Sequence, residues 1–223
     1  MMSTSKSGFS AIILLAISIF PGRALPDTFT EGGDAYKNKD YTTAAAKFKE
    51  VAAKGDHRAM YALGSMYAGG TGVKRDYQEA FKWFSEAAKY GRPDAIYKIG
   101  LMYELGVGVR QDYRAAARYY QKTAEKGYGH AQFKLGQLYL HGNGMQPDPV
   151  KAFAWMYVAR LNFLKTKPAA GPGQEGEEPQ SGDIFATIHQ EVINAELEKL
   201  KPQLTAAQIA EADKLVQQYS QYR

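Results

Sequence analysis

The chain has 223 residues, of which 45% are hydrophobic, so it is long enough to bury one medium-sized core or a short array of repeats. It contains no cysteine, which excludes disulfide bonds, thiolate metal sites and cysteine nucleophiles. The formal net charge of +5, without a run of basic residues, argues against a nucleic-acid partner, and we expect none.

The N-terminal segment has the features of a secretory signal peptide. Lys6 gives it a positive start, residues 9–20 form an uncharged apolar run, and the run stops at Pro21. Ala24 and the glycine two residues before it supply the small residues of a cleavage site. The alternative is a membrane anchor, but a spanning helix needs about 20 apolar residues. We predict that residues 1–24 are removed, and that the mature chain is periplasmic or secreted and does not associate with membranes.

Beyond the leader, the chain repeats itself at a step of 36 residues, with four units at about 31–55, 59–91, 95–127 and 131–164. Each unit reads as two helices, for example residues 95–105 and 113–126, with apolar residues at helical spacing. The fold class predicted is therefore all-α. The recurring positions include Ala59/Ala95/Ala131, Leu63/Ile99/Leu135, Gly64/Gly100/Gly136, Tyr67/Tyr103/Tyr139 and Trp83/Tyr119/Trp155.

The repeated glycines divide into two groups. Gly64, Gly100 and Gly136 fall inside the first helix of a unit, where glycine costs about 1 kcal/mol relative to alanine. Three such glycines in register predict close backbone approach between the two helices of a unit. Gly106 and Gly108, with their equivalents, lie in the connecting turn, where we expect positive φ angles.

Aspartates also recur at the start of each second helix, at Asp40, Asp76, Asp112 and Asp148. Repeated acids in register could be catalytic. Their position before a helical pattern instead favours helix capping, and Glu79 follows Asp76 at the spacing of a capping box. We interpret the four as N-caps.

The pattern Ala-x3-Leu-Gly-x2-Tyr-x2-Gly-x-Gly-Val-x2-Asp-x3-Ala-x2-Trp-x3-Ala-Ala-x2-Gly, found in residues 59–91, resembles the Sel-1-like repeat, a relative of the tetratricopeptide repeat. Three units match it, and the second of these has Tyr119 for Trp and Thr123 for Ala. The unit at 31–55 lacks the Gly-x-Gly turn. The resemblance implies a right-handed α-solenoid of helix pairs that serves as an adaptor for protein complexes.

Two further segments follow the repeats. Residues 165–182 are rich in Pro, Gly and Glu and predict a flexible linker. Residues 183–223 predict two helices that cap the apolar end of the solenoid. We expect Asp183 to cap the first of them, and Thr205, with a glutamine three residues later, to open the second in a capping box. The expected apolar faces are Ile184, Ile188, Val192 and Leu200, and then Ile209, Ala212, Val216 and Tyr219.

The sequence offers little support for catalysis. None of the HExxH, GxSxG or GxxxxGK[ST] motifs is present. His130 and His141 could approach each other to bind a metal, but a position at the surface or rim explains them better. We expect no metal, no cofactor and no catalytic residue. Some cysteine-rich relatives are linked to β-lactam binding or hydrolysis, so a β-lactam or cell-wall hydrolase is the enzyme alternative, without the cysteines or a nucleophile–base set here.

The resemblance also implies a binding surface, because first-helix side chains line the concave groove of tetratricopeptide repeats. The corresponding positions are Arg58, Tyr61, Ser65 and Ala68; Asp94, Tyr97, Leu101 and Glu104; and His130, Phe133, Gln137 and Leu140. Tyr61, Tyr97 and Phe133 form an aromatic ladder, whose rings either face a ligand or pack between repeats. We expect a monomer that binds a protein or peptide, either as an envelope scaffold or as a secreted effector that binds host proteins.

Overall fold

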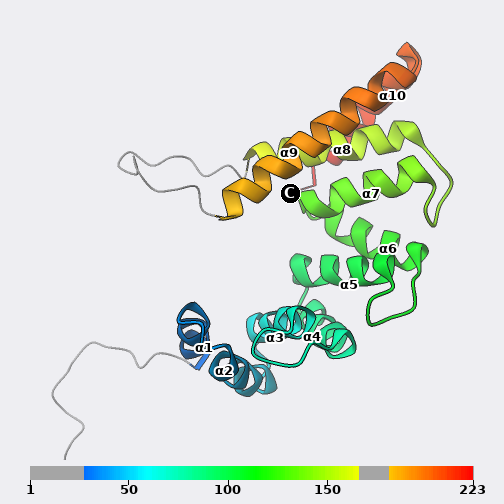
Figure 1. Cartoon of the computed structure of the whole chain (residues 1–223). Coiled ribbons are helices and arrows are strands. Elements are labelled where there is room, and N and C mark those ends of the chain that lie inside the picture. The colour runs from blue at the N-terminus through cyan, green and yellow to red at the C-terminus, as the bar shows by residue number, and fades with distance from the viewer. Residues whose placement is uncertain (1–27, 166–180, 223) are drawn as a thin grey trace, which may run out of the picture.

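The computed structural model describes residues 28–165 and 181–222, which leaves the predicted leader and nearly all of the predicted linker outside the described residues. Within these ranges the chain forms ten α-helices and one short 3-10 helix, with no strand (Figure 1). The helices are α1 (Thr28–Lys37), α2 (Tyr41–Ala53), α3 (His57–Gly69), α4 (Tyr77–Lys89), α5 (Pro93–Leu105), α6 (Tyr113–Ala124), α7 (Gly129–His141), α8 (Pro149–Lys165), α9 (Ser181–Leu200), η1 (Lys201–Gln203) and α10 (Ala206–Tyr219).

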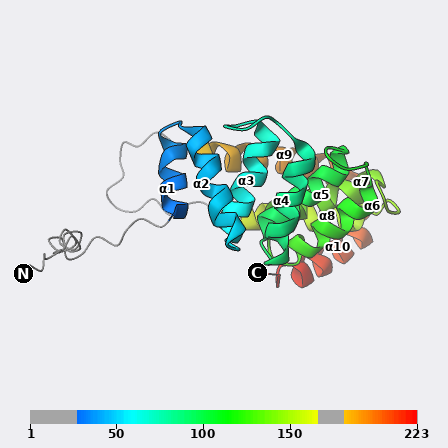
Figure 2. The same ribbon diagram turned by 90° about the horizontal axis from the view of Figure 1, so that it is seen from below.

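The first eight helices form four consecutive pairs, and each pair stacks on the next. The most extensive packing is within pairs, α1 with α2, α3 with α4, α5 with α6 and α7 with α8. The second helix of each pair also packs on the first helix of the next pair. Figure 2 shows this succession from α1 to α8 along the length of the molecule. The prediction of an all-α solenoid of helix pairs is confirmed.

The helical glycines lie where the two helices of a pair meet. A Cβ atom added to Gly64 would come within 2.7 Å of the Phe84 ring, and one added to Gly100 within 2.7 Å of the Tyr120 ring. At Gly136 the added atom would meet both the Met156 side chain and the Ala152 carbonyl. The predicted packing of these glycines against the second helix is confirmed, but close backbone approach is found only at Gly136, because an aromatic ring fills the space at Gly64 and Gly100. 

A glycine that the sequence pattern did not single out has the same role in the first pair. A Cβ atom added to Gly32 of α1 would come within 2.8 Å of the Phe48 ring of α2. The first pair, although its connecting turn is shorter, therefore keeps the same contact between its helices.

The repeated aspartates are helix caps, as predicted. Asp40 accepts a hydrogen bond from the Thr43 backbone N–H, and Asp112 accepts one from the Ala115 N–H. Asp76 and Asp148 cap α4 and α8 in the same way. Each carboxylate satisfies a donor in the first turn of its helix, which has no partner inside the helix.

The Gly-x-Gly turns join one pair to the pair before it. Gly108 has a φ angle of +73°, and a Cβ atom there would lie 2.4 Å from the Tyr77 carbonyl oxygen of the preceding pair. Only a residue without a side chain fits both the angle and this contact. The turn thus fixes how the α5–α6 pair sits on α4.

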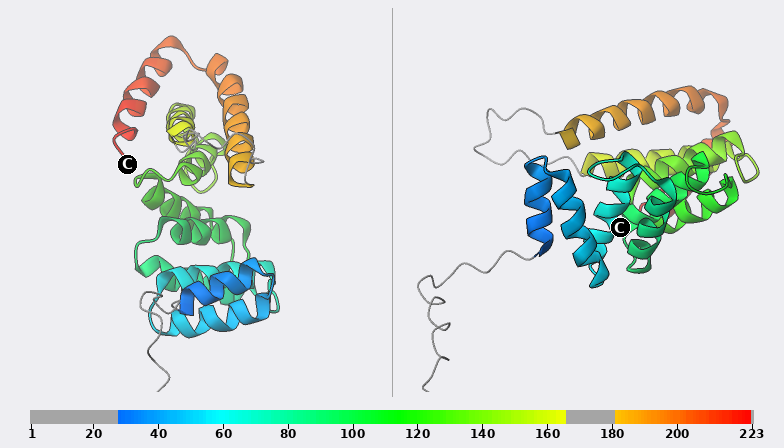
Figure 3. Two further views of the ribbon diagram at one scale, coloured as in Figure 1. Left: turned by 90° about the vertical axis from the view of Figure 1, so that its left-hand side faces the viewer. Right: turned by 60° about the horizontal axis from the view of Figure 1, so that its bottom comes forward.

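The C-terminal helices lie on either side of α8. In the left-hand view of Figure 3, α8 is seen nearly end-on between α9 and α10, and both helices pack against it. The Trp155 ring of α8 stacks on Tyr219 of α10, with centroids 4.0 Å apart. Residues of α7, α8, α9 and α10 share one core cluster, so the last repeat is covered by these helices rather than open to solvent.

Two details of α9 differ from the prediction. The helix begins at Ser181, so Asp183 lies inside it and is not its N-cap. Val192 is 44% exposed, whereas Ile193 and Leu197 are buried. Leu200 is buried as predicted, but Ile193 takes the place expected for Val192, because the contact with α8 selects the face. The capping box of Thr205 at the start of α10 is confirmed.

Candidate protein-binding surface

The twelve predicted positions lie on α3, α5 and α7 and form what we call the first-helix face. The structure gives them different degrees of exposure. Arg58 and Ser65 are exposed, and Phe133 is buried. The others are half-buried: Tyr61, Ala68, Asp94, Tyr97, Leu101, Glu104, His130, Gln137 and Leu140.

Tyr97, the central residue of the aromatic ladder, packs between two repeats. Its ring contacts Tyr120 of its own pair and Tyr128 at the start of the next, with centroids 5.6 and 5.4 Å away. The His130 ring lies 5.9 Å from it. Burial raises the pKa of Tyr97 to about 12, and the carboxylate of Glu104 adds to this effect. The ring therefore supports the fold and keeps only part of its surface open.

Tyr61 occupies the equivalent place one repeat earlier. It packs on Phe84 of its own pair, and the Arg92 guanidinium lies over its ring, 5.0 Å from the centroid. Burial also raises the pKa of Tyr61. Arg92 is held in turn by an ion pair with Asp94 at 2.5 Å and by a contact with His57 Nδ1 at 3.3 Å. Each of these two ladder rings is thus covered by the residue that precedes the next repeat's first helix.

Phe133 is a core residue. It is 7% exposed and belongs to the cluster that α8, α9 and α10 complete, and half-buried Leu140 packs against the same cluster. The three rings of the aromatic ladder therefore have different environments. Phe133 packs inside the protein, whereas Tyr61 and Tyr97 both pack between repeats and present part of their surface outward.

Glu104 has two side-chain partners, one in its own helix pair and one in the next. It accepts a hydrogen bond from the Tyr120 hydroxyl at 2.5 Å and pairs with Lys134 Nζ at 2.8 Å. Its side chain is 17% exposed, so the pair is largely shielded from water. The carboxylate and the hydrogen bond to it also raise the pKa of Tyr120, in addition to the effect of burial.

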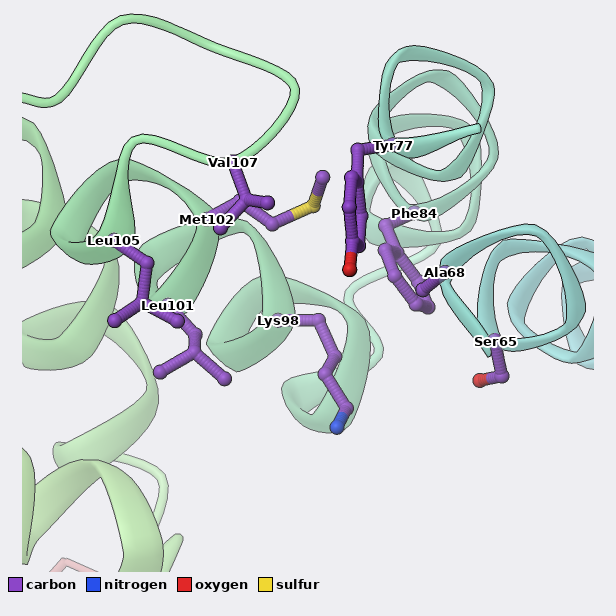
Figure 4. A pocket seen from close by; sticks show the side chains of 9 residues that line it. All are labelled: Ser65, Ala68, Tyr77, Phe84, Lys98, Leu101, Met102, Leu105 and Val107. Carbon is purple, nitrogen blue, oxygen red and sulfur yellow. The ribbon is translucent and has the colours of Figure 1, made fainter. Parts of the chain in front are cut away.

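A pocket of about 210 Å³ lies between the second and third helix pairs (Figure 4). We call it the Lys98 pocket. It includes the predicted positions Ser65, Ala68 and Leu101. The sequence analysis did not predict the rest of the lining. Lys98 and Lys134 lie 36 residues apart, and this repetition was a signal that could have indicated a role for Lys98. The remaining lining residues are Tyr77, Phe84, Lys98, Met102, Leu105 and Val107.

The described residues offer no arrangement suited to metal binding, because no three of their His, Asp or Glu side chains gather around one point. His130 packs edge-on against Phe163, with centroids 4.8 Å apart, and His141 is exposed at the end of α7. No helix in the described part of the chain is long and apolar enough to cross a membrane.

Comparison with known families identifies the repeats. The profile of the Sel1 repeat matches residues 57–91, 93–128 and 129–160. The chain carries three Sel1 repeats. The three matches correspond to the pairs α3–α4, α5–α6 and α7–α8, and α8 continues beyond the last match to Lys165. Proteins built from Sel1 repeats are generally protein-interaction scaffolds and are typically not catalytic. No curated protein matches the chain significantly.

Solved structures agree with this assignment. A Sel1 repeat protein from Oxalobacter formigenes is 28% identical, with a TM-score of 0.56 over 61% of this chain and 58% of that one. The protein c5321, a protective antigen of uropathogenic Escherichia coli strains with an SLR fold, is 23% identical, with a TM-score of 0.51 over 87% of this chain and 45% of that one. This Sel1 repeat chain therefore matches only about half the length of either protein, and the second likeness concerns the fold alone.

Proposed function

We propose that the chain is a non-enzymatic scaffold that holds a protein or peptide partner on its first-helix face. The observation that carries this proposal is a contrast between equivalent positions. One fully buried position repeats the same residue, at Ala59, Ala95 and Ala131. The more open positions of the first-helix face change chemistry from repeat to repeat.

Ser65, Leu101 and Gln137 are equivalent residues at the step of 36. Ser65 is exposed and the other two are half-buried, so none of them is fixed by the core. At this partly open position the side chain changes from a hydroxyl to an isobutyl group and then to an amide. A partner that spans several repeats would meet a different group at each, which is how repeat proteins read an extended ligand.

We further propose that the chain acts outside the cytoplasm. The support is the leader: a lysine, an uncharged apolar run and a small-residue cleavage site within residues 1–24. Envelope scaffolding and binding of host proteins after secretion both fit this leader, and the cellular fraction that contains the partner distinguishes them.

The test compares two double variants with the same chemical changes. Ser65→Glu with Gln137→Glu places two anions on α3 and α7, on the first-helix face. Ser85→Glu with Gln121→Glu places two anions on α4 and α6, the second helices. Each mature protein is used to capture partners from native envelope extract, with quantification by mass spectrometry and with melting temperatures measured in parallel.

We expect the first double variant to lose partner capture by about tenfold or more, equivalent to about 1.4 kcal/mol, at an unchanged melting temperature. The second double variant should capture as the unmodified protein does. Equal capture by the two variants, or loss only with the second, would contradict binding through the first-helix face.

A further inference from the structure

The Lys98 pocket is apolar, with a single cationic side chain in its lining. Leu101, Met102 and Leu105 of α5 form one side, and Ala68 of α3 and Phe84 of α4 form the other (Figure 4). Lys98 extends between them. Leu105 is 59% exposed, and Tyr77 at the opposite rim is 37% exposed. The pocket therefore has an apolar rim that is open to solvent.

The ammonium group of Lys98 has no acidic partner among the described residues. The nearest acid on its own helix is Asp94, one turn earlier, and that carboxylate is engaged by Arg92 at 2.5 Å. Ser65 cannot supply a second donor to a ligand as it stands, because its hydroxyl donates to the Tyr61 carbonyl oxygen. An unpaired cation beside exposed apolar side chains favours a ligand that brings a carboxylate.

The next repeat shows how the same site is completed within the chain. Lys134 is the equivalent of Lys98, and its ammonium binds Glu104 Oε1 at 2.8 Å. The Tyr120 hydroxyl binds the other oxygen of the same carboxylate at 2.5 Å. In that repeat the carboxylate comes from the first helix of the preceding unit and lies between the two helix pairs.

In the Lys98 pocket, the two residues that bind the equivalent lysine, or its carboxylate partner, in the next repeat are replaced by apolar residues. The equivalent of Glu104 is Ala68, and the equivalent of Tyr120 is Phe84. The lysine remains, but the carboxylate that neutralises it and the hydroxyl that orients that carboxylate are both missing. The small side chain of Ala68 leaves room where the glutamate side chain lies one repeat later.

The residues at the rim of the Lys98 pocket are also more apolar than their equivalents in the following repeat. Leu105 and Val107 stand where the following repeat has His141 and Asn143, and Leu101 corresponds to a glutamine. The pocket without an internal carboxylate is therefore also the more apolar of the two. At Lys134 the site is completed by an ion pair within the chain. At Lys98 the site fits an acid from another molecule, with an apolar residue beside that acid.

We propose that the Lys98 pocket binds a glutamate side chain of the partner, with its carboxylate on Lys98 and an adjacent aliphatic residue of the partner on Leu101 and Leu105. The inference deepens the proposed function, on which it rests. The bound glutamate takes the place that Glu104 occupies in the next repeat. The occupant is thus an acidic and aliphatic peptide segment of another protein.

Ala68→Glu tests the proposal from inside the chain. This substitution supplies the missing carboxylate on the same helix position as Glu104, so we expect it to pair with Lys98 and to close the pocket at an unchanged or raised melting temperature. Lys98→Glu reverses the charge of the pocket. Lys122→Glu, at an exposed site on α6, is the control with the same change of net charge.

The probe is a phage-displayed library of random peptides selected on the full chain, followed by synthetic peptides of the enriched sequence with Glu, Gln or Lys at the acidic position. We expect enrichment of a glutamate next to Leu, Ile or Val. Replacing that Glu by Gln, or introducing Ala68→Glu or Lys98→Glu, should weaken binding by tenfold or more, and Lys122→Glu should not. The Lys peptide should bind best to Lys98→Glu.

The outcomes separate the two proposals. Enriched peptides without an acid, or binding that persists in both Ala68→Glu and Lys98→Glu, would overturn the glutamate pocket while leaving a peptide-binding scaffold in place. If the library yields no peptide that binds the full chain, the result contradicts the pocket and also counts against peptide binding as the proposed function.

Discussion

Gly100 lies against the ring of Tyr120, so close that a Cβ atom on the glycine would come within 2.7 Å of the ring's Cε1. The tyrosine is fully buried and is held at its other end by Glu104. The ring therefore has little room to move away, and the packing of α5 on α6 depends on the missing side chain.

Substitution of this glycine should destabilise the fold. Gly100→Ala forces the added methyl group against the ring, and we expect a loss of about 1–3 kcal/mol in the free energy of unfolding. Urea unfolding measures the change. The matched control is Gly33→Ala in α1, where an added Cβ meets nothing within 4 Å and alanine's higher helix propensity should stabilise by up to about 1 kcal/mol. Equal effects at the two sites would contradict close helix packing at Gly100.

The N-cap of α3 should give a pH-dependent stability. Hydrogen bonding to Arg58 and to backbone N–H groups lowers the pKa of Asp56 from its ordinary 3.8 to about 2. Because the folded-state pKa is the lower one, the stabilisation is present above pH 3.8 and is lost as the pH falls toward 2. We expect Asp56→Ala to cost about 0.5–2 kcal/mol at neutral pH, with the cost shrinking over this acid range.

The control for this effect is an uncharged cap. Thr205 caps α10 through its hydroxyl in a capping box. Thr205→Ala should therefore lower the free energy of unfolding by a similar amount at neutral and at acidic pH. Urea unfolding of the two variants and the unmodified protein at neutral and acidic pH provides the comparison. A cost of Asp56→Ala that stays constant with pH would show that the carboxylate charge does not matter.

Substitutions of Tyr97 and Leu101 should have different effects on stability and on partner binding. Tyr97 packs against three rings from two repeats, so Tyr97→Ala should lower the free energy of unfolding by about 2–3 kcal/mol. Tyr97→Phe keeps the ring and should retain most of this stability. Leu101→Ala removes part of the Lys98 pocket wall and should reduce partner capture more than stability. Normal capture by folded Leu101→Ala protein would place the partner elsewhere.

The leader gives a prediction about the mature protein. We expect the exported form to begin at Leu25, directly after the small-residue site, and to be recovered from the periplasm or the medium. N-terminal sequencing of the purified protein from each cell fraction measures this. Replacing Ala24 by a bulky residue should block cleavage and retain the precursor. Recovery of an intact Met1 on the unmodified protein in membranes would favour the anchor instead.

The sequence alone determined the features that depend on neighbours along the chain. The 36-residue step, the aspartate caps and the glycines inside the first helices are each recognisable from a few consecutive residues, because helix capping and helix periodicity are local properties. The contact of Gly100 with the second helix of its pair also followed, since a helical glycine repeated in register needs a packing reason.

Only the tertiary structure decided what depends on contacts between repeats. Phe133 and Tyr97 are equivalent in sequence, but Phe133 lies in the core that α9 and α10 complete, which no local pattern reveals. Val192 faces outward because the contact with α8 selects the neighbouring residues of α9. Lys134 is neutralised by a glutamate 30 residues away, whereas Lys98 meets an alanine at that position. The candidate site arises from this difference, because a charge is neutralised by whichever groups the fold places beside it.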